Sequence, residues 1–144
     1  MAHRVLITGG FGYLGGRLSQ FLSSQGNYEV LLGSRNQTQS PSWLPTARIV
    51  QTQWDSIPSL LKVCSGVKTI VHLAGMNAEN CSVDPATALE VNAVSTTRFL
   101  QVAIRQGVKR FIYLSTAHVY GNPLMGVITE ETRPVPTHPY AYSH

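Results

Sequence analysis

The chain has 144 residues, of which 43% are hydrophobic and only 12% are charged, so its length allows one sizeable core but not two full domains. No apolar run approaches the ~20 residues that cross a bilayer, and no signal-peptide pattern precedes the first strand pattern, so we expect a cytoplasmic protein without a membrane partner. The net charge is +4 and the pI is near 9.3, but the 11 basic residues are scattered singly, which argues against a nucleic-acid partner.

The first half of the chain alternates between strand and helix patterns. Continuous apolar runs predict strands at residues 4–8, 29–34, 47–51 and 69–73. A helix is expected at 12–24, where one face would carry Leu14, Leu18, Phe21 and Leu22. A polar loop is expected at 36–45 and a short helix at 57–63. Cys64 and Cys81 form neither a disulfide framework nor a metal-ligand spacing, and we interpret both as reduced and structural.

The second half continues the alternation with a longer helix and a fifth strand. Asp84 can cap this helix, with Pro85 in its first turn, and Gly107 ends it. Its spacing places five residues on one face, namely Leu89, Ala93, Thr96, Leu100 and Ala103. The fifth strand is expected at 110–115, and the segment 121–139 that follows is rich in proline and glycine. Because right-handed crossovers lay helices on both faces of a parallel sheet, the fold class is α/β.

A glycine-rich turn joins the first predicted strand to the first predicted helix. It reads Thr8-Gly-Gly-Phe-Gly-Tyr-Leu-Gly15, and its spaced glycines are Gly9, Gly12 and Gly15. Glycines at such a turn allow a tight bend, a close approach of backbone to a pyrophosphate, and close packing of helix on strand. The helix amides and dipole then favour phosphate, so we expect the turn, including Phe11, Tyr13 and Leu14, to bind a dinucleotide. The alternative is a glycine-rich turn that binds nothing.

In this context, the motif Thr-Gly-x-x-Gly-x-x-Gly resembles that of the extended short-chain dehydrogenase/reductase superfamily, of the NAD(P)-dependent epimerase/dehydratase type. The resemblance covers essentially the whole chain and implies a Rossmann-type doubly wound parallel sheet with helices on both faces, truncated after the fifth strand. Residues 1–144 would then form an incomplete NAD(P)-binding domain, without the later strands and the substrate lobe of the family. The chain would be either a fragment of a longer protein or a natural short form. The fifth strand would be left as an exposed edge unless a partner covers it.

The resemblance also implies further cofactor contacts. Asp55 looks like the acid that such proteins place on the adenine amino group, with a helix N-cap as its alternative role. His72-Leu73-Ala74-Gly75 is similar to the end of the fourth strand of the family, where Leu73, Ala74 and Gly75 would let adenosine lie against backbone. Asn92 matches a helix asparagine near the cofactor, and a satisfied buried amide is its alternative. His72 itself is interpreted as a core histidine.

The residues after the second strand bear on the choice of dinucleotide. An acid at this position would bind the ribose hydroxyls and select NAD. No Asp or Glu occurs in residues 30–54, whereas Arg35 follows the strand and could pair with a 2′-phosphate. The sequence therefore favours NADP over NAD, with a solvated loop arginine as the alternative.

By the same resemblance, Thr116 supplies the catalytic hydroxyl and Tyr140 is the acid/base of hydride transfer, with Ser115 and Tyr142 as weaker candidates. Tyr140 would also lie beside the cofactor. The family has a lysine four residues after this tyrosine, on the same helix face, but here His144 occupies that position and no lysine follows Lys109. A largely neutral histidine would stabilise a tyrosinate less than a lysine does.

The leading hypothesis is an NAD(P)-dependent epimerase, dehydratase or reductase whose small-molecule substrate is a nucleotide sugar. The sugar rests on analogy alone. Two alternatives stay open, a non-catalytic dinucleotide-binding module and an inactive fragment. The substrate identity and the oligomeric state are also open, and a homodimer is one of the alternatives.

Overall fold

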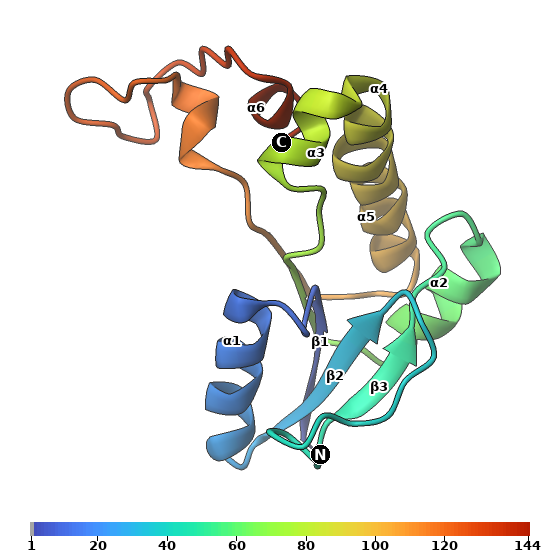
Figure 1. The fold of residues 1–144 in the computed structure, drawn as a ribbon. Helices are drawn as coiled ribbons and strands as arrows, with labels where there is room; N and C mark the ends of the chain where they lie inside the picture. The colour runs from blue at the N-terminus through green and yellow to red at the C-terminus, as the bar shows by residue number, and fades with distance from the viewer. Residues whose placement is uncertain (1) are drawn as a thin grey trace. The chain divides into compact units, whose positions relative to one another are not determined.

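The computed structural model describes residues 2–144, and its strands form one sheet in the order β3-β2-β1-β4-β5 (Figure 1). All four pairings between neighbouring strands are parallel. The strands are β1 His3–Thr8, β2 Tyr28–Ser34, β3 Arg48–Gln51, β4 Thr69–His72 and β5 Arg110–Tyr113. Each lies where an apolar run predicted a strand, and the parallel sheet is confirmed.

The helices also follow the predicted order, with shorter pieces added. They are α1 Tyr13–Ser24, α2 Ile57–Cys64, α3 Ala78–Val83, α4 Pro85–Ala88, the π-helical turn η1 Leu89–Val94, α5 Ser95–Arg105, the 3₁₀ turn η2 Ala117–Tyr120 and α6 Pro139–Ser143. Asp84 caps α4 as expected, since its Oδ1 accepts the Thr87 N–H at 3.0 Å. Among residues 2–144, no helix has the length and apolar character that crossing a membrane requires.

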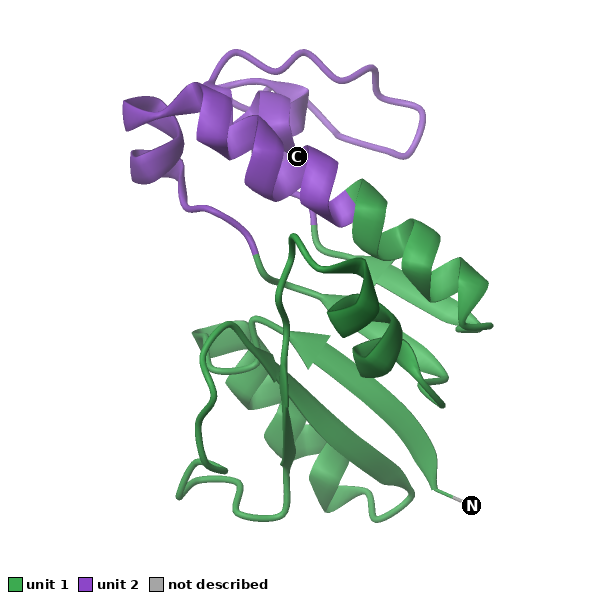
Figure 2. Cartoon of the chain, turned by 90° about the vertical axis from the view of Figure 1, so that its right-hand side faces the viewer, with its two compact units in different colours: residues 1–74, 97–114 green, residues 75–96, 115–144 purple. Residues whose placement is uncertain are grey.

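The chain divides into two compact units (Figure 2). Unit 1 contains residues 1–74 and 97–114, and therefore the whole sheet with α1, α2 and most of α5. Unit 2 contains residues 75–96 and 115–144, and therefore α3, α4, η1, η2 and α6.

Helices cover both faces of the sheet in unit 1, with α1 on one side and α2 on the other (Figure 1). Alternate residues of β1 divide between the two cores. Leu6 belongs to the cluster with α2 and α5, which includes Leu60 and Phe99, while Val5 and Ile7 belong to the cluster packed by α1. This alternation confirms the doubly wound arrangement, because the central strand β1 is buried on both faces.

The structure corrects the buried face of α1. Leu14 and Phe21 were expected inside but are 56% and 61% exposed, while Leu18 and Leu22 pack against the core. The fully buried residues of this helix are Gly15 and Ser19. The rotation follows from the close approach of the helix to the glycine turn, which only a residue without a side chain permits at position 15.

The buried face of the long helix also differs from the predicted one, because most of its buried residues lie one position earlier in the chain. Leu89 and Leu100 of the predicted face are 49% and 37% exposed, whereas Ala103 of that face is buried as expected. The other buried residues are Ala88, Asn92, Ser95, Phe99 and Val102. Hydropathy alone favours the two leucines. The observed face brings a polar side chain inside, which is possible because the Asn92 amide is hydrogen-bonded there.

Candidate functional site

The glycine turn lies at the carboxyl end of β1, where the strand order reverses between β1 and β4, the place at which ligands bind in open parallel sheets. Gly9 has φ +67° and its carbonyl accepts the Gly12 N–H at 2.9 Å. A Cβ on Gly9 would lie 2.9 Å from the backbone of Leu73, and one on Gly15 would lie 2.7 Å from the Cα of Gly10. Turn, helix and β4 therefore pack backbone against backbone.

The first amides of α1 are available to an anion. Those of Tyr13, Leu14 and Gly15 have no acceptor within the helix, the N-cap Gly12 offers no capping side chain, and the first turn carries no acidic residue. Phe11 and Tyr13, beside this turn, are 44% and 83% exposed. The amides and the helix dipole together favour a negatively charged group.

Thr8, the last residue of β1, connects this turn to the end of β4. Its Oγ1 accepts the N–H groups of Leu73 and Ala74 at 3.2 and 3.3 Å and lies 2.6 Å from Nδ1 of His72. The hydroxyl proton therefore points to His72, whose ring is buried between Phe99 and other aromatic rings as a core histidine. The N–H groups of Leu73 and Ala74 both donate to Thr8. A cofactor would therefore have to contact other atoms of these two residues. No pattern in the sequence indicated this role of Thr8.

The two other predicted cofactor residues of unit 1 lie at the surface. Arg35 follows β2 directly, its side chain is exposed and its carbonyl accepts from Gln51 at 3.1 Å. The Asp55 carboxylate is 99% exposed and lies 3.9 Å from Arg98, a pairing of little energetic weight in water. The alternative role of Asp55 as a helix N-cap is wrong, because Ser56 caps α2 by accepting the Ser59 N–H.

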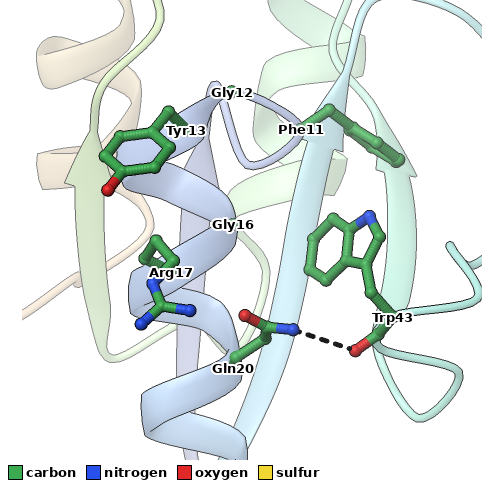
Figure 3. Close-up of a pocket in the computed structure, with 7 residues that line it drawn as sticks. All are labelled: Phe11, Gly12, Tyr13, Gly16, Arg17, Gln20 and Trp43. Atoms are coloured by element: carbon green, nitrogen blue, oxygen red, sulfur yellow. Dashed lines mark hydrogen bonds between the residues drawn. The ribbon is translucent and has the colours of Figure 1, made fainter.

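A shallow depression of about 200 Å³ lies on the solvent side of α1 (Figure 3). Gly12 and Gly16 belong to its lining, and Phe11 and Trp43 pack edge to face on one side, with ring centroids 6.5 Å apart. Tyr13, Arg17 and Gln20 complete the lining. Ligand pockets usually enclose ~300–1,000 Å³, so this depression is too small to hold a dinucleotide.

Asn92 connects three segments of unit 2. Its Oδ1 accepts the Met76 N–H at 2.7 Å, and its Nδ2 donates to Ser143 Oγ of α6 at 2.9 Å and lies 3.6 Å from Cys81 Sγ of α3. The side chain is buried, within a π-helical turn of a kind often found at functional sites. Gly75 lies beside it, since a Cβ on Gly75 would be 3.1 Å from the Asn92 Oδ1.

The predicted catalytic pair lies on one face of α6. The rings of Tyr140 and His144 are 4.2 Å apart between centroids, and both side chains are half-buried. Thr116 is the N-cap of η2, where its Oγ1 accepts the His118 N–H at 3.2 Å. Ser115 donates to the His144 carbonyl at 3.4 Å. Tyr142 is 64% exposed.

The protonation state of His144 follows from its contacts. The Tyr140 carbonyl, which can only accept, lies 2.9 Å from Nδ1, so this nitrogen carries a proton. Burial lowers the pKa of the imidazole below its ordinary value, against the opposing effect of that hydrogen bond. His144 is therefore neutral at pH 7 and supplies no fixed positive charge beside Tyr140.

Comparisons with known proteins agree with the fold. Residues 5–144 match the model of the NAD dependent epimerase/dehydratase family. UDP-glucose 4-epimerase 2 of Arabidopsis thaliana is 30% identical over 97% of this chain. Among solved structures, the UDP-Glc/GlcNAc 4-epimerase from Campylobacter jejuni is 25% identical over 99% of the chain, with a TM-score of 0.83. A dTDP-glucose 4,6-dehydratase from Streptomyces venezuelae with NAD bound is 29% identical over 97% of the chain, again with a TM-score of 0.83. The chain spans 44%, 46% and 48% of the lengths of these three proteins.

Proposed function

The chain belongs to the NAD dependent epimerase/dehydratase family, and on this premise we propose that it is the dinucleotide-binding part of an enzyme that acts on a nucleotide sugar. The observation that carries the proposal is the turn at β1 and α1. Added side chains at Gly9 or Gly15 would meet backbone, and the amides after Gly12 lack capping acceptors. Such a cradle fits two linked phosphates.

In this proposal, the amides of Tyr13, Leu14 and Gly15 bind the pyrophosphate. Thr8 holds the backbone of Leu73 and Ala74 in place, and this backbone borders the adenosine. Asp55 accepts a hydrogen bond from the adenine amino group. The exposure of Asp55 leaves its carboxylate accessible to such a donor. When bound, the dinucleotide supplies or accepts a hydride.

Arg35 selects NADP over NAD in this proposal. Its exposed guanidinium directly follows β2, and residues 30–54 contain no acid that would bind ribose hydroxyls and repel a 2′-phosphate. Titration of the chain with NADPH and NADH tests the assignment, and NADPH should bind more tightly. Replacing the arginine (Arg35→Ala) should remove most of that preference. Arg48→Ala, which changes an exposed arginine of β3, is the matched control. An unchanged NADPH/NADH ratio in Arg35→Ala would refute the role of Arg35.

We further propose that Tyr140 exchanges a proton with the sugar hydroxyl or carbonyl while Thr116 hydrogen-bonds the same oxygen. The Thr116 hydroxyl accepts from a backbone N–H and so keeps its own proton for a substrate oxygen. Asn92 holds α6 through Ser143. The substrate class is drawn from the relatives, which include 4-epimerases of UDP-glucose and a 4,6-dehydratase of dTDP-glucose.

The neutral His144 favours a second candidate function, a dinucleotide-binding module without turnover. Without a cation on the helix face of Tyr140, proton transfer from the sugar hydroxyl is less favoured at neutral pH. A panel of UDP- and dTDP-sugars, assayed for turnover with bound NADP or NAD, separates the two functions. Turnover that Tyr140→Phe abolishes supports the enzyme. Tight dinucleotide binding without turnover of any sugar in the panel supports the module.

A further inference from the structure

The start of α6 is capped by an unusual residue. His138 is the N-cap, and its Nδ1 accepts the Tyr140 N–H at 3.2 Å. Pro139, at the first helical position, has no N–H to donate. Ser, Thr, Asp and Asn are the residues usually found as N-caps, and none of them changes from acceptor to donor near neutral pH. An imidazole does.

A second contact fixes where the proton of this imidazole lies. Nε2 of His138 is 2.8 Å from the Oγ of Ser82 in α3, and that hydroxyl donates its one proton to the Ala78 carbonyl at 3.0 Å. The hydroxyl oxygen therefore accepts from Nε2–H. The Tyr140 amide can only donate, so Nδ1 must carry a lone pair. Both contacts are satisfied by one species, the neutral ring protonated on Nε2.

Protonation of His138 would break the cap. The imidazolium carries a proton on both nitrogens, and Nδ1–H would then face the Tyr140 N–H, donor against donor. α6 has only five residues, too few to be stable by itself, so its cap and its packing decide whether it forms.

The titratable groups around α6 bear on this protonation. The elements that pack against α6 are α3, α4, η1 and η2. Their titratable groups, together with those of α6 itself, are Glu79, Cys81, Asp84 at the start of α4, Glu90, His118, Tyr120, Tyr140, Tyr142 and His144. Within residues 2–144, none of these carboxylates forms an ion pair with His138.

We propose that His138 is a positioning residue for Tyr140, whose neutral Nε2–H form caps α6 and binds it to α3, and whose protonation releases the first turn of that helix. The use of Tyr140 as acid/base rests on the proposed function, whereas the cap does not. Acid pH would therefore disorder the position of Tyr140 by a route separate from the chemistry of its own hydroxyl.

The first experiment determines the tautomer in the 144-residue chain by NMR of ¹⁵N-labelled histidine. The His138 signals are assigned by their loss in His138→Asn. At neutral pH, Nε2 should be protonated and Nδ1 should be an acceptor. The opposite tautomer, or a ring already doubly protonated at pH 7.5, would overturn the proposal.

The second experiment measures hydrogen exchange of the Tyr140 amide between pH 5 and 8, corrected for intrinsic exchange. Protection in the parent protein should fall about fivefold on acidification, the loss expected for a cap. His138→Asn, which keeps a capping side chain that does not titrate, should hold its protection across this range, and His138→Ala should be low throughout. Ser82→Ala, which leaves the contact between Nδ1 and the Tyr140 N–H in place, should keep the cap at neutral pH.

Equal protection at all pH values in the parent protein and both His138 variants would overturn the inference. The outcome is distinguishable from failure of the proposed function. If Tyr140→Phe left turnover unchanged, the acid/base role would be lost while the exchange result for the cap would stand.

Discussion

Two neighbouring glycines of α1 should respond in opposite ways to the same substitution. In Gly15→Ala, the new methyl group would lie 2.7 Å from the Cα of Gly10 and 2.9 Å from the carbonyl carbon of Gly9, and it would also collide with the Gly9 carbonyl oxygen. All of these atoms are backbone, so the turn itself must move. In Gly16→Ala, the methyl group would lie 3.6 Å from the Trp43 ring and 3.8 Å from the Gly10 carbonyl oxygen, which are ordinary contacts.

The magnitudes follow from this difference. Overpacking against well-packed neighbours costs about 1–3 kcal/mol, which lowers the Tm of a protein of this size by roughly 3–10 °C. Gly16→Ala adds no clash and gains up to ~1 kcal/mol of helix propensity, so its Tm should be unchanged or higher. Because Gly15 closes the proposed phosphate cradle, Gly15→Ala should also lose dinucleotide binding, which Gly16→Ala retains.

Calorimetric melting of the two variants and the parent protein, followed by titration with NADPH and NADH, measures both effects. Each variant serves as the control for the other, since the substitution and the helix are the same. If Gly15→Ala melted at or above the parent temperature and bound the dinucleotide equally well, the close approach of backbone at this turn could not be what shapes the site.

Three further outcomes are expected. Replacing Thr8 by valine should destabilise the protein by about 1–3 kcal/mol, because buried partners including His72 lose their hydrogen bond, whereas Thr8→Ser should lose much less, as denaturant unfolding can measure. Burial raises the pKa of the Cys64 thiol to about 12, so iodoacetamide at pH 8 should label this residue only after denaturation, and labelling of the native protein would contradict its burial. Burial lowers the pKa of His144 in the folded state. Below about pH 6.5 the unfolded state therefore binds more protons than the folded state does. The stability should fall as the pH drops from about 6.5 through the lowered pKa of the folded state. In His144→Gln that part of the pH dependence should vanish from the unfolding curves.

The sequence alone determined the features that depend on local pattern. Five apolar runs located the five parallel strands, and Asp84 with Pro85 located the start of a helix, because strand burial and helix capping act over a few residues. The glycine spacing at 9, 12 and 15 likewise located the turn, since its close contacts are dictated by which positions lack a side chain.

Only the tertiary structure decided which side chains meet across long separations. Hydropathy misplaced the buried faces of both main helices, because Leu14 and Leu89 stay exposed while Gly15 and Asn92 take the inner positions. The bonds from Thr8 to the end of β4, from Asn92 to Ser143 and from Ser82 to His138 join residues far apart in the chain. Hydrogen bonds of this kind fix tautomers and orient helices, and they exist only once the fold has brought each donor to its acceptor. No periodicity along the chain encodes them.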